Sequence, residues 1–571
     1  MASNSSGRLH YEHPLSSDSS LESLYIDGHP PYRSLPNSLW LLFLILSLWL
    51  VLKAHAAYYA RRFTARKLIE VEGIKAQIPA EACQRTSYVQ LPVATAYHCD
   101  VGKVTIDTLP DDALLEIFDC YLHDEATSME AWHTMVHVCK KWRNVVFGSP
   151  RRLDLRLYCE AKTPVREILN IWPPELPILV WSDGHEKWGM DNIIAALEHI
   201  DRICVLGLVD IPSSQLEKVL AEMQRPSPAL TDLYLQFHGE TPLVVPSSFL
   251  GGSAPLLQTL DLNNIPFPGL PKLLLSATHL VELRLLNIPY SGHFSPEMMA
   301  TCLSVPTRLE SLEIGFESPR SRPGRQSRHS PPRTHLPFLT KFWFKGVCEY
   351  LEDLVARIDA PLLDSLEIIF FHQLIFDTPR LAQFIGRAPK IKAQDGAHVE
   401  FTNLDVRVTL PNTNQQTLYR ALKFTISCSQ SDWQLSSLVQ VCSSSFPQAL
   451  ICTVEDLYIS ENRFFPVPWQ DDLESNQWLE LLHPFTAVKD LKLSRDFTRH
   501  IAPALQELVG YRTMEVLPAL QTISIDVPLT RDDSDEPVSS GFPFPSRLVQ
   551  ESFDQFVASR ELASHPITIR H

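Results

Sequence analysis

The sequence predicts an α/β fold in which short parallel strands and helices alternate over most of the chain. Two observations support this class: an apolar template recurs at near-regular intervals from residue 200 onward, and helical stretches separate several of its copies. A third observation divides the chain, because two amphipathic helices and an apolar segment precede the repeats. We therefore expect a small helical module followed by one elongated repeat domain, although 571 residues would by length alone suggest about four domains.

The template has apolar residues at positions i, i+3 and i+5. Clear copies begin at Ile200, Leu230, Leu257, Leu280, Leu309, Leu339 and Leu363, so successive first positions lie 30, 27, 23, 29, 30 and 24 residues apart. Weaker copies begin at Val454, Val488 and Leu520, and a further weak one includes Phe424 and Ile426. These positions share no face of a helix, because they fall at about 0°, 300° and 140° around its axis. The last two positions alternate as in a strand, so each copy predicts a short strand.

Helical stretches are expected at 215–223, 349–358 and 380–386. A strand followed by a helix at this period is typical of leucine-rich repeats, and residues 170–526 resemble that family. The resemblance implies a solenoid whose repeats bury their apolar faces on their neighbours and expose a row of parallel strands on a concave, protein-binding surface. The spacing argues against chance recurrence in a leucine-rich chain.

The repeats depart from the family pattern at the residue eight positions after the first, which is usually asparagine or cysteine. Ile265, Ile288 and Phe371 occupy this position, and Asn462 fits the pattern. We therefore expect an irregular arc without a continuous asparagine ladder. Residues 318–335, rich in Ser, Pro, Gly and Arg, are expected to form a disordered insertion.

Two amphipathic helices are expected within residues 105–157. Pro110 suits the first position of the first helix, and Asp111 and Asp112 place negative charge in its first turn. Its apolar stripe is Leu114, Ile117, Phe118 and Tyr121; the second helix is expected to open at Thr127 or Ser128, with the stripe Trp132, Met135, Val136, Cys139, Trp142 and Val146. Two such helices cannot bury all their apolar surface, so one face is expected to bind a partner. The alternative is a hairpin packed on the rest of the chain.

The joint spacing of Leu109-Pro110, Leu114, Ile117-Phe118, Val138-Cys139 and Trp142-Arg143 resembles an F-box, and residues 147–157 resemble the following segment in many fungal F-box proteins. The resemblance implies a substrate-recognition subunit of an SCF-type cullin-RING ubiquitin ligase, which is not itself a catalyst. Its partners would be the ligase adaptor, through it cullin, and a protein substrate on the repeats. The implied adaptor-binding residues are Leu109, Pro110, Leu114, Ile117, Phe118, Val138, Cys139 and Trp142.

Two features depart from the F-box pattern. The spacer at residues 121–131 is longer and more polar than usual, and Arg151-Arg152-Leu153 stands where the family usually has tryptophan. They motivate an alternative hypothesis, a membrane-associated leucine-rich-repeat scaffold that does not engage the ligase.

An apolar segment before the helical module predicts a membrane anchor. Residues 39–52 are apolar apart from Ser47 and would span about 21 Å as a helix, against a hydrocarbon core of about 30 Å. Extension to residue 60 gives about 33 Å, so we expect a transmembrane helix at 38–60. The basic residues Arg61, Arg62, Arg66 and Lys67 follow, which places the F-box and repeats in the cytoplasm. A buried helix, a falsely joined upstream exon and a soluble cytoplasmic or nuclear protein are the alternatives.

The other segments are expected to carry no fold of their own. Residues 1–37 are rich in Ser, Pro and Gly and are expected to be disordered. Residues 61–104 form a linker, and residues 527–571 a flexible tail.

The composition argues against several other functions. The net charge of −16 and pI of about 5.7 argue against nucleic-acid binding. The eleven cysteines form no Cys-x-x-Cys pair, and the twenty-one histidines show no metal-ligand spacing. No hydrolase, phosphate-loop or dinucleotide-binding motif occurs, so we expect no enzyme, cofactor or metal. An unrecognised hydrolase on an α/β solenoid remains an alternative, because catalytic groups can be assembled in space.

Overall fold

The computed structural model describes residues 109–570 apart from 123–130, 151, 154, 160–163, 184–189, 238–242, 320–332, 392–394, 412–420, 429–430, 463–474, 509 and 527–546. All described residues belong to one compact unit, Val104–His571. The expected N-terminal segment 1–37, the transmembrane helix 38–60 and the linker 61–104 lie outside the described residues. Within the described part of the chain, no helix is long and apolar enough to cross a membrane.

One large sheet organises this unit. Sixteen of the described strands form it, and in spatial order they are β1 (Leu157–Cys159), β2 (Ile178–Asp183), β3 (Ile203–Val209), β4 (Asp232–Gln236), β5 (Thr259–Asn263), β6 (Glu282–Ile288), β7 (Ser311–Phe316), β9 (Lys341–Gly346), β11 (Ser365–Phe371), β14 (Ala421–Ser427), β13 (Asp405–Pro411), β12 (Gly396–Phe401), β15 (Asp456–Glu461), β16 (Asp490–Ser494), β17 (Thr522–Asp526) and β18 (Thr568–Arg570). A small second sheet pairs β8 (Thr334–His335) with β10 (Ile358–Asp359).

Helices connect most of the strands. They are α2 (Asp111–Leu122), α3 (Ala131–Val138), α4 (Lys140–Gly148), α5 (Val165–Ile171), α6 (Met190–Leu197), α7 (Ser213–Glu222), α8 (Leu270–Leu274), α9 (Pro296–Leu303), α10 (Cys348–Val355), α11 (Pro379–Gly386), α12 (Ser431–Ser444), α13 (Gln448–Ile451), α14 (Ser475–Leu482), α15 (Arg495–Gln506) and α16 (Arg547–Leu562), with 3₁₀ turns η3 (Phe249–Gly252), η4 (Tyr290–Gly292), η5 (Pro389–Ile391) and η6 (Gly510–Met514). The three helical stretches expected from the sequence correspond to α7, α10 and α11, each within a few residues.

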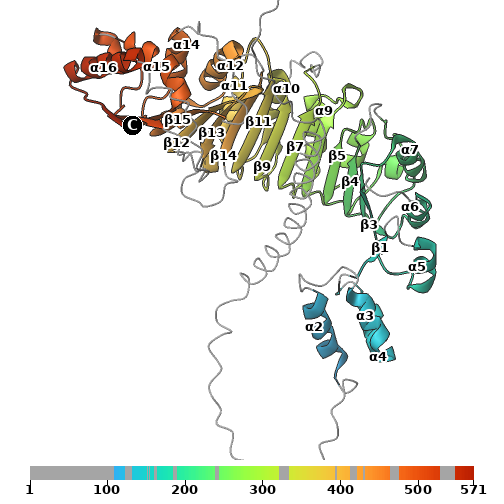
Figure 1. Ribbon diagram of the computed structural model, residues 1–571. Coiled ribbons are helices and arrows are strands. Elements are labelled where there is room, and N and C mark those ends of the chain that lie inside the picture. Colours follow the sequence, from blue (N-terminus) through green and yellow to red (C-terminus); the bar gives the residue numbers. More distant parts are fainter. Residues whose placement is uncertain are drawn as a thin grey trace, which may run out of the picture. The chain divides into compact units, whose positions relative to one another are not determined.

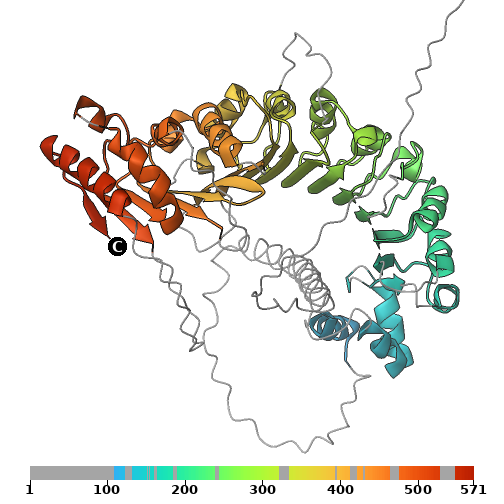
Figure 2. The ribbon, with the colours of Figure 1, turned by 45° about the horizontal axis from the view of Figure 1, so that its top comes forward.

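The apolar template marks strands, as expected. Its last two positions lie in a strand in every copy, and outside β3 they face the helices; in β5, β6 and β7, Leu260, Leu283 and Leu312 are fully buried. In β3 the register shifts, and Val205 pairs with Asp232 on the opposite face of the sheet. Figures 1 and 2 show the strands side by side on the inner side of a curve, with the helices on its outer side. The core therefore lies between sheet and helices. The α/β class and the long sheet of mainly parallel strands are confirmed, and they are consistent with a leucine-rich-repeat-like solenoid.

One strand breaks the parallel order. β13 is antiparallel to both β14 and β12, whereas the other paired strands of the large sheet are parallel. The sequence prediction missed β12 and β13, although apolar residues alternate in both, at Ala397, Val399 and Phe401 and at Val406, Val408 and Leu410. These strands form a hairpin and lack the i, i+3, i+5 template, so a search for repeats passes over them.

The array is longer than residues 170–526 at both ends. It starts with β1, which begins at the last residue of the segment expected to be F-box and extends just beyond it. The sequence did not predict β1, because a three-residue strand is too short to carry the template. The array ends with β18, which pairs in parallel with β17, so the expected flexible tail 527–571 is wrong for residues 547–570. The insertion expected at 318–335 is wrong for Thr334 and His335, which form β8.

Polar residues with left-handed backbone lie at or just after the ends of several strands. Asp210, Asn264 and Asn287 have φ of 57°, 58° and 48°, which asparagine and aspartate tolerate better than most residues. The Asn264 Nδ2 donates a hydrogen bond to the Phe237 carbonyl oxygen at 3.0 Å. The Asn287 Nδ2 donates to Asn263 Oδ1 at 2.9 Å. Asparagines thus link neighbouring repeats, but they lie one residue before the position at which the family pattern has asparagine or cysteine.

Candidate protein-interaction surfaces

The helical module contains three short described helices, where two were expected. α3 ends at Val138 and α4 begins at Lys140, because Cys139 has an extended backbone with φ of −156° and ψ of 171°. The Cys139 Sγ accepts a hydrogen bond from the Trp142 backbone N–H at 3.4 Å and so caps α4. The expected start at Thr127 or Ser128 lies outside the described residues.

The core of the module joins α2 to α4. The rings of Phe118 and Trp142 meet edge to face with centroids 4.7 Å apart. The Lys141 Nζ donates to the Leu109 carbonyl oxygen at 2.6 Å and lies 3.7 Å from Asp111 Oδ1. The start of α2 is thereby held against α4.

The eight residues expected to bind an adaptor divide by exposure. Pro110, Ile117 and Val138 are exposed, the last two by 49% and 54%. Leu109, Cys139 and Trp142 are half-buried, whereas Leu114 and Phe118 are buried at 0% and 1% exposure. Leu114 and Phe118 therefore support the module from inside and have no side-chain surface to offer a partner in this conformation.

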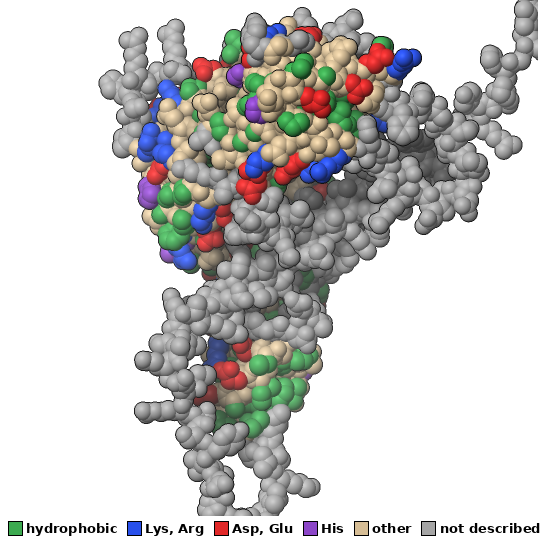
Figure 3. Space-filling model, turned by 90° about the vertical axis from the view of Figure 1, so that its left-hand side faces the viewer, with side chains coloured by type: hydrophobic (Ala, Val, Ile, Leu, Met, Phe, Trp, Pro, Cys, Tyr) green, Lys and Arg blue, Asp and Glu red, His purple; other side chains and the backbone are tan. Residues whose placement is uncertain are grey.

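The exposed apolar residues of α2, with the proline just before it, form a stripe. Pro110, Ile117 and Tyr121 lie at i, i+7 and i+11, which places them on one side of the helix. Tyr121 is 44% exposed. Figure 3 shows hydrophobic side chains gathered on the small helical part at the bottom of its view. We call Pro110, Ile117 and Tyr121, together with the exposed Val138 of α3, the hairpin surface.

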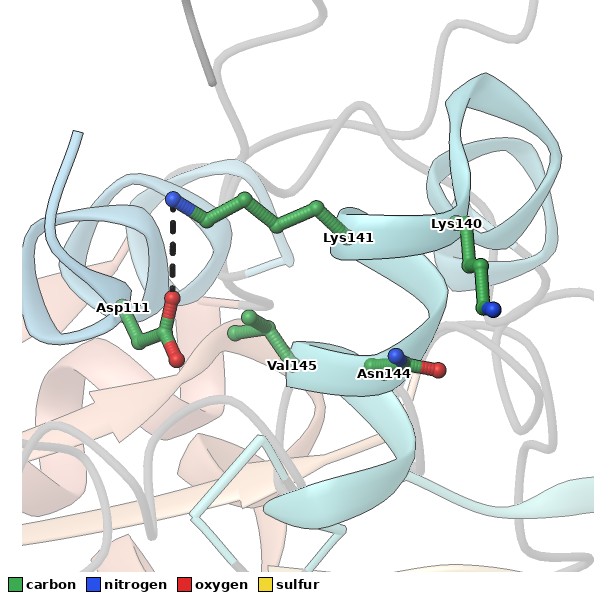
Figure 4. A pocket seen from close by; sticks show the side chains of 5 residues that line it. All are labelled: Asp111, Lys140, Lys141, Asn144 and Val145. Atoms are coloured by element: carbon green, nitrogen blue, oxygen red, sulfur yellow. Dashed lines mark ion pairs between the residues drawn. The ribbon is translucent and has the colours of Figure 1, made fainter. Parts of the chain in front are cut away.

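A hollow of about 430 Å³ lies between α2 and α4. Asp111, Lys140, Lys141, Asn144 and Val145 line it, and Figure 4 shows Lys141 reaching across to Asp111. The hollow thus offers both signs of charge.

Aromatic rings fix the module to the first repeat. The Trp132 Nε1 donates to the Arg156 carbonyl oxygen at 3.2 Å. Trp172, at the end of α5, meets the rings of Trp132, His133 and Phe147 at centroid distances of 5.1, 5.0 and 5.9 Å. Trp172 is not among the residues predicted from the sequence. Its contacts make the module and the start of the solenoid one packed structure.

The inner face of the sheet is the second candidate surface. Strand register aligns one residue from each strand into a continuous row across it. From β2 to β9 this row is Trp181, Gly207, Tyr234, Asp261, Arg284, Glu313 and Trp343. The row contains aromatic and charged side chains, which suits recognition of a protein surface.

Arg284 holds the centre of this row. Its Nη1 lies 3.1 Å from Asp261 Oδ2, and its Nε donates to Glu313 Oε2 at 2.9 Å. The three side chains retain 12%, 11% and 20% exposure, respectively. The carboxylates on both neighbouring strands therefore orient the guanidinium, and the charged triad is formed before any partner arrives.

Two tryptophans lie flat where glycine provides room. A Cβ on Gly207 would lie 2.1 Å from Trp181 Cε3, and one on Gly315 would lie 2.7 Å from Trp343 Cζ3. Only glycine allows the rings this close approach to the sheet. The Trp181 ring also meets Tyr234, with centroids 5.7 Å apart.

The described residues that come closest to a catalytic arrangement are His398 and Ser460. The His398 Nε2 and Ser460 Oγ are 2.7 Å apart, and burial lowers the pKa of His398, which favours the neutral base. The nearby Glu400 carboxylate is engaged by Arg407 at 2.9 Å and by Asn462 at 3.0 Å. It is therefore committed elsewhere and does not serve as the third group that orients a base. Among the described residues, no group of three His, Cys, Asp or Glu is placed to hold a metal ion.

Comparison with known proteins gives a structural likeness. No family model and no curated protein matches the chain. Among solved structures, the leucine-rich repeat-containing protein LegL7 from Legionella pneumophila is similar at 11% identity, with a TM-score of 0.24, over 70% of this chain and 97% of that chain. The class of this protein therefore rests on its own geometry, which is a sheet of mainly parallel strands with helices on one face and a helical module at its start.

Proposed function

We propose that this protein is a substrate-recognition subunit of an SCF-type cullin-RING ubiquitin ligase. The hairpin surface carries the proposal. The F-box-like spacing leaves Pro110, Ile117 and Val138 exposed, as a docking site for the ligase adaptor requires. Exposed apolar residues gathered on a small module are typical of protein-interaction sites.

In this proposal the chain acts by proximity. The hairpin surface would bind the adaptor and, through it, cullin, while the inner face of the sheet would hold the protein substrate. The ring contacts of Trp172 keep the module packed on the first repeat. A substrate held at a fixed distance from the conjugating enzyme reacts at a raised effective concentration, so the chain itself needs no catalytic group.

Co-purification tests the proposal. The wild-type full chain is expected to retrieve adaptor and cullin, and the Leu109→Ala/Pro110→Ala variant to retrieve much less of both. Lys141 donates to the Leu109 carbonyl oxygen, so this backbone contact survives the change. Leu109 also packs partly on the core, so the variant must keep the wild-type unfolding midpoint for lost retrieval to count as lost docking surface. Leu374→Ala, at a side chain 81% exposed elsewhere on the chain, is the control and should behave as wild type.

If the wild type retrieves neither subunit, the ligase proposal fails. The alternative, a membrane-associated leucine-rich-repeat scaffold that does not engage the ligase, would then be favoured. The break at Cys139 supports that alternative, because it shortens the second helix of the expected F-box pattern.

The proposal includes a membrane location. The apolar residues 38–60 would anchor the chain, and the basic residues that follow would keep the module and repeats on the cytoplasmic side. The full chain is expected to stay with the membrane pellet during alkaline carbonate extraction, and a chain lacking residues 1–60 to appear in the supernatant. Release of the full chain would contradict a spanning helix.

A further inference from the structure

The inner face of the sheet carries an excess of negative charge between β4 and β7. Asp232, Asp261, Glu282 and Glu313 lie on this face, and Arg284 is the basic residue among them. Four carboxylates and one guanidinium leave a formal charge of −3 over four neighbouring strands. We call these four carboxylates the acidic strip. Charges this little exposed interact more strongly than charges in open water, because the surroundings screen them less.

A second, independent feature of the same face indicates a ligand. Ser311 pairs in register with Glu282 on one side and Lys341 on the other, so its side chain lies on the inner face. It is 6% exposed, and its Oγ has no hydrogen-bond partner. A buried polar group without a partner is costly, and a hydrogen-bonding group of a bound molecule would remove that cost.

The neighbouring strands define the ends of the strip. On one side, Trp181 and Tyr234 form an aromatic pair over Gly207, and the faces of such rings attract cations. On the other side, Lys341 and Lys345 of β9 add positive charge and would repel a cation. Three strand spacings separate β4 from β7, which is about 14 Å and corresponds to four or five residues of extended chain at about 3.3 Å each.

We propose that the acidic strip binds a short basic stretch, in extended conformation, of a partner protein. The aromatic pair would receive a lysine or arginine at one end, the carboxylates would face the basic side chains in the middle, and the lysines of β9 would mark where the basic stretch stops. This inference deepens the proposed function by naming the substrate class, and it rests on that proposal for calling the partner a substrate. The binding itself is independent of the ligase.

Binding of two synthetic peptides to the full chain in mild detergent tests the proposal. One fluorescent peptide carries five alternating Arg and Lys residues between Gly-Ser flanks, and the other carries Glu and Asp in their place. Fluorescence anisotropy is expected to show binding of the basic peptide, with an affinity that falls as salt is raised. The acidic peptide is expected not to bind.

Matched variants locate the site. Asp232→Asn should weaken binding of the basic peptide about threefold to tenfold, and Trp181→Leu about fivefold. Asp490→Asn is the control, because Asp490 is also the half-buried first residue of its strand but lies far along the sheet on β16. It should leave the affinity unchanged. The Asp232 carboxylate accepts a hydrogen bond from Thr231 Oγ1 at 2.8 Å, which the asparagine oxygen retains, so the fold is preserved.

Every other outcome overturns the inference. Absence of binding to the basic peptide would overturn it. Binding that all three variants weaken equally, or not at all, would also overturn it, because such binding would reflect general attraction to a chain of net charge −16. Measuring how much adaptor the Asp232→Asn variant retrieves distinguishes this inference from the ligase proposal. Failed peptide binding with normal adaptor retrieval removes this inference alone, and specific peptide binding without adaptor retrieval removes the ligase proposal alone.

Discussion

Replacing Arg560 with alanine is expected to lower the free energy of unfolding of the C-terminal repeats by about 3–5 kcal/mol. Arg560 is fully buried in the last turn of α16, and its Nη2 donates to the carbonyl oxygens of Val516 and Leu517 at 2.9 and 2.8 Å. Leu517 is itself held at a left-handed φ of 49°. The variant would remove the Arg560 donor from both buried carbonyls and leave the Leu517 oxygen with the Leu520 backbone N–H alone, so the folded state loses two charge-assisted hydrogen bonds.

Urea denaturation of the full chain and hydrogen exchange over residues 516–526 and 547–562 measure this effect. Arg547→Ala is the matched control, because Arg547 is 93% exposed and pairs with Glu551 one helical turn away. Its expected cost is within about 0.5 kcal/mol. Similar exchange rates in both variants would show that α16 does not hold the end of the sheet.

Replacing Ile117 with glutamate is expected to weaken adaptor binding at least about thirtyfold, the equivalent of about 2 kcal/mol. Ile117 lies at the middle of the stripe on α2 and is about half exposed, so the change leaves the core of the module intact. In the complex, however, the new carboxylate would be buried among apolar groups without a partner. The loss would therefore appear in binding while the stability of the free chain stays close to that of the wild type.

Ile375→Glu is the matched control for this change. Ile375 is 72% exposed and belongs to the segment between β11 and α11, so the substitution is chemically identical on a different surface. It should leave adaptor affinity unchanged. Equal weakening by both variants would point to a general effect of added negative charge.

The strands of the repeat array could be predicted because one physical rule repeats. In most copies the last two apolar positions face the helices, so Leu260 and Leu262 of β5 predict a strand as clearly as Leu283 and Leu285 of β6 do. The copy in β3 is the exception, because a register shift turns Val205 to the inner face. The helices α7, α10 and α11 could be predicted for the same reason, since their apolar faces cover that row. The hairpin of β12 and β13 does not follow this rule, and the alternation of apolar and polar residues is its only sequence signal for strands.

The C-terminal elements carried a signal that their surroundings obscured. Val549, Phe553 and Phe556 of α16 lie at i, i+4 and i+7 and are buried, which is an ordinary amphipathic pattern. The polar run before them favours a flexible tail and so hides this pattern. Burial of Arg560 could not be predicted, because its partners are carbonyl oxygens more than 40 residues away in sequence.

The candidate docking site could be predicted as a set of residues but not as a surface. Spacing alone cannot separate Ile117, which is exposed, from Phe118, which packs against Trp142 inside the module. The break at Cys139 was equally hidden, because one extended residue barely disturbs the apolar periodicity and neither Gly nor Pro marks it. The inner-face row could not be predicted from the sequence, since the order of its residues depends on strand register across seven strands.

The most direct measurement of the central claim is the equilibrium affinity between the purified full chain and the purified adaptor subunit. Our account predicts saturable binding with one adaptor per chain, weakened by Ile117→Glu and unchanged by Ile375→Glu. Absence of saturable binding by the wild type, or binding that Ile117→Glu leaves unchanged, would contradict the claim that the hairpin surface connects this repeat protein to a ubiquitin ligase.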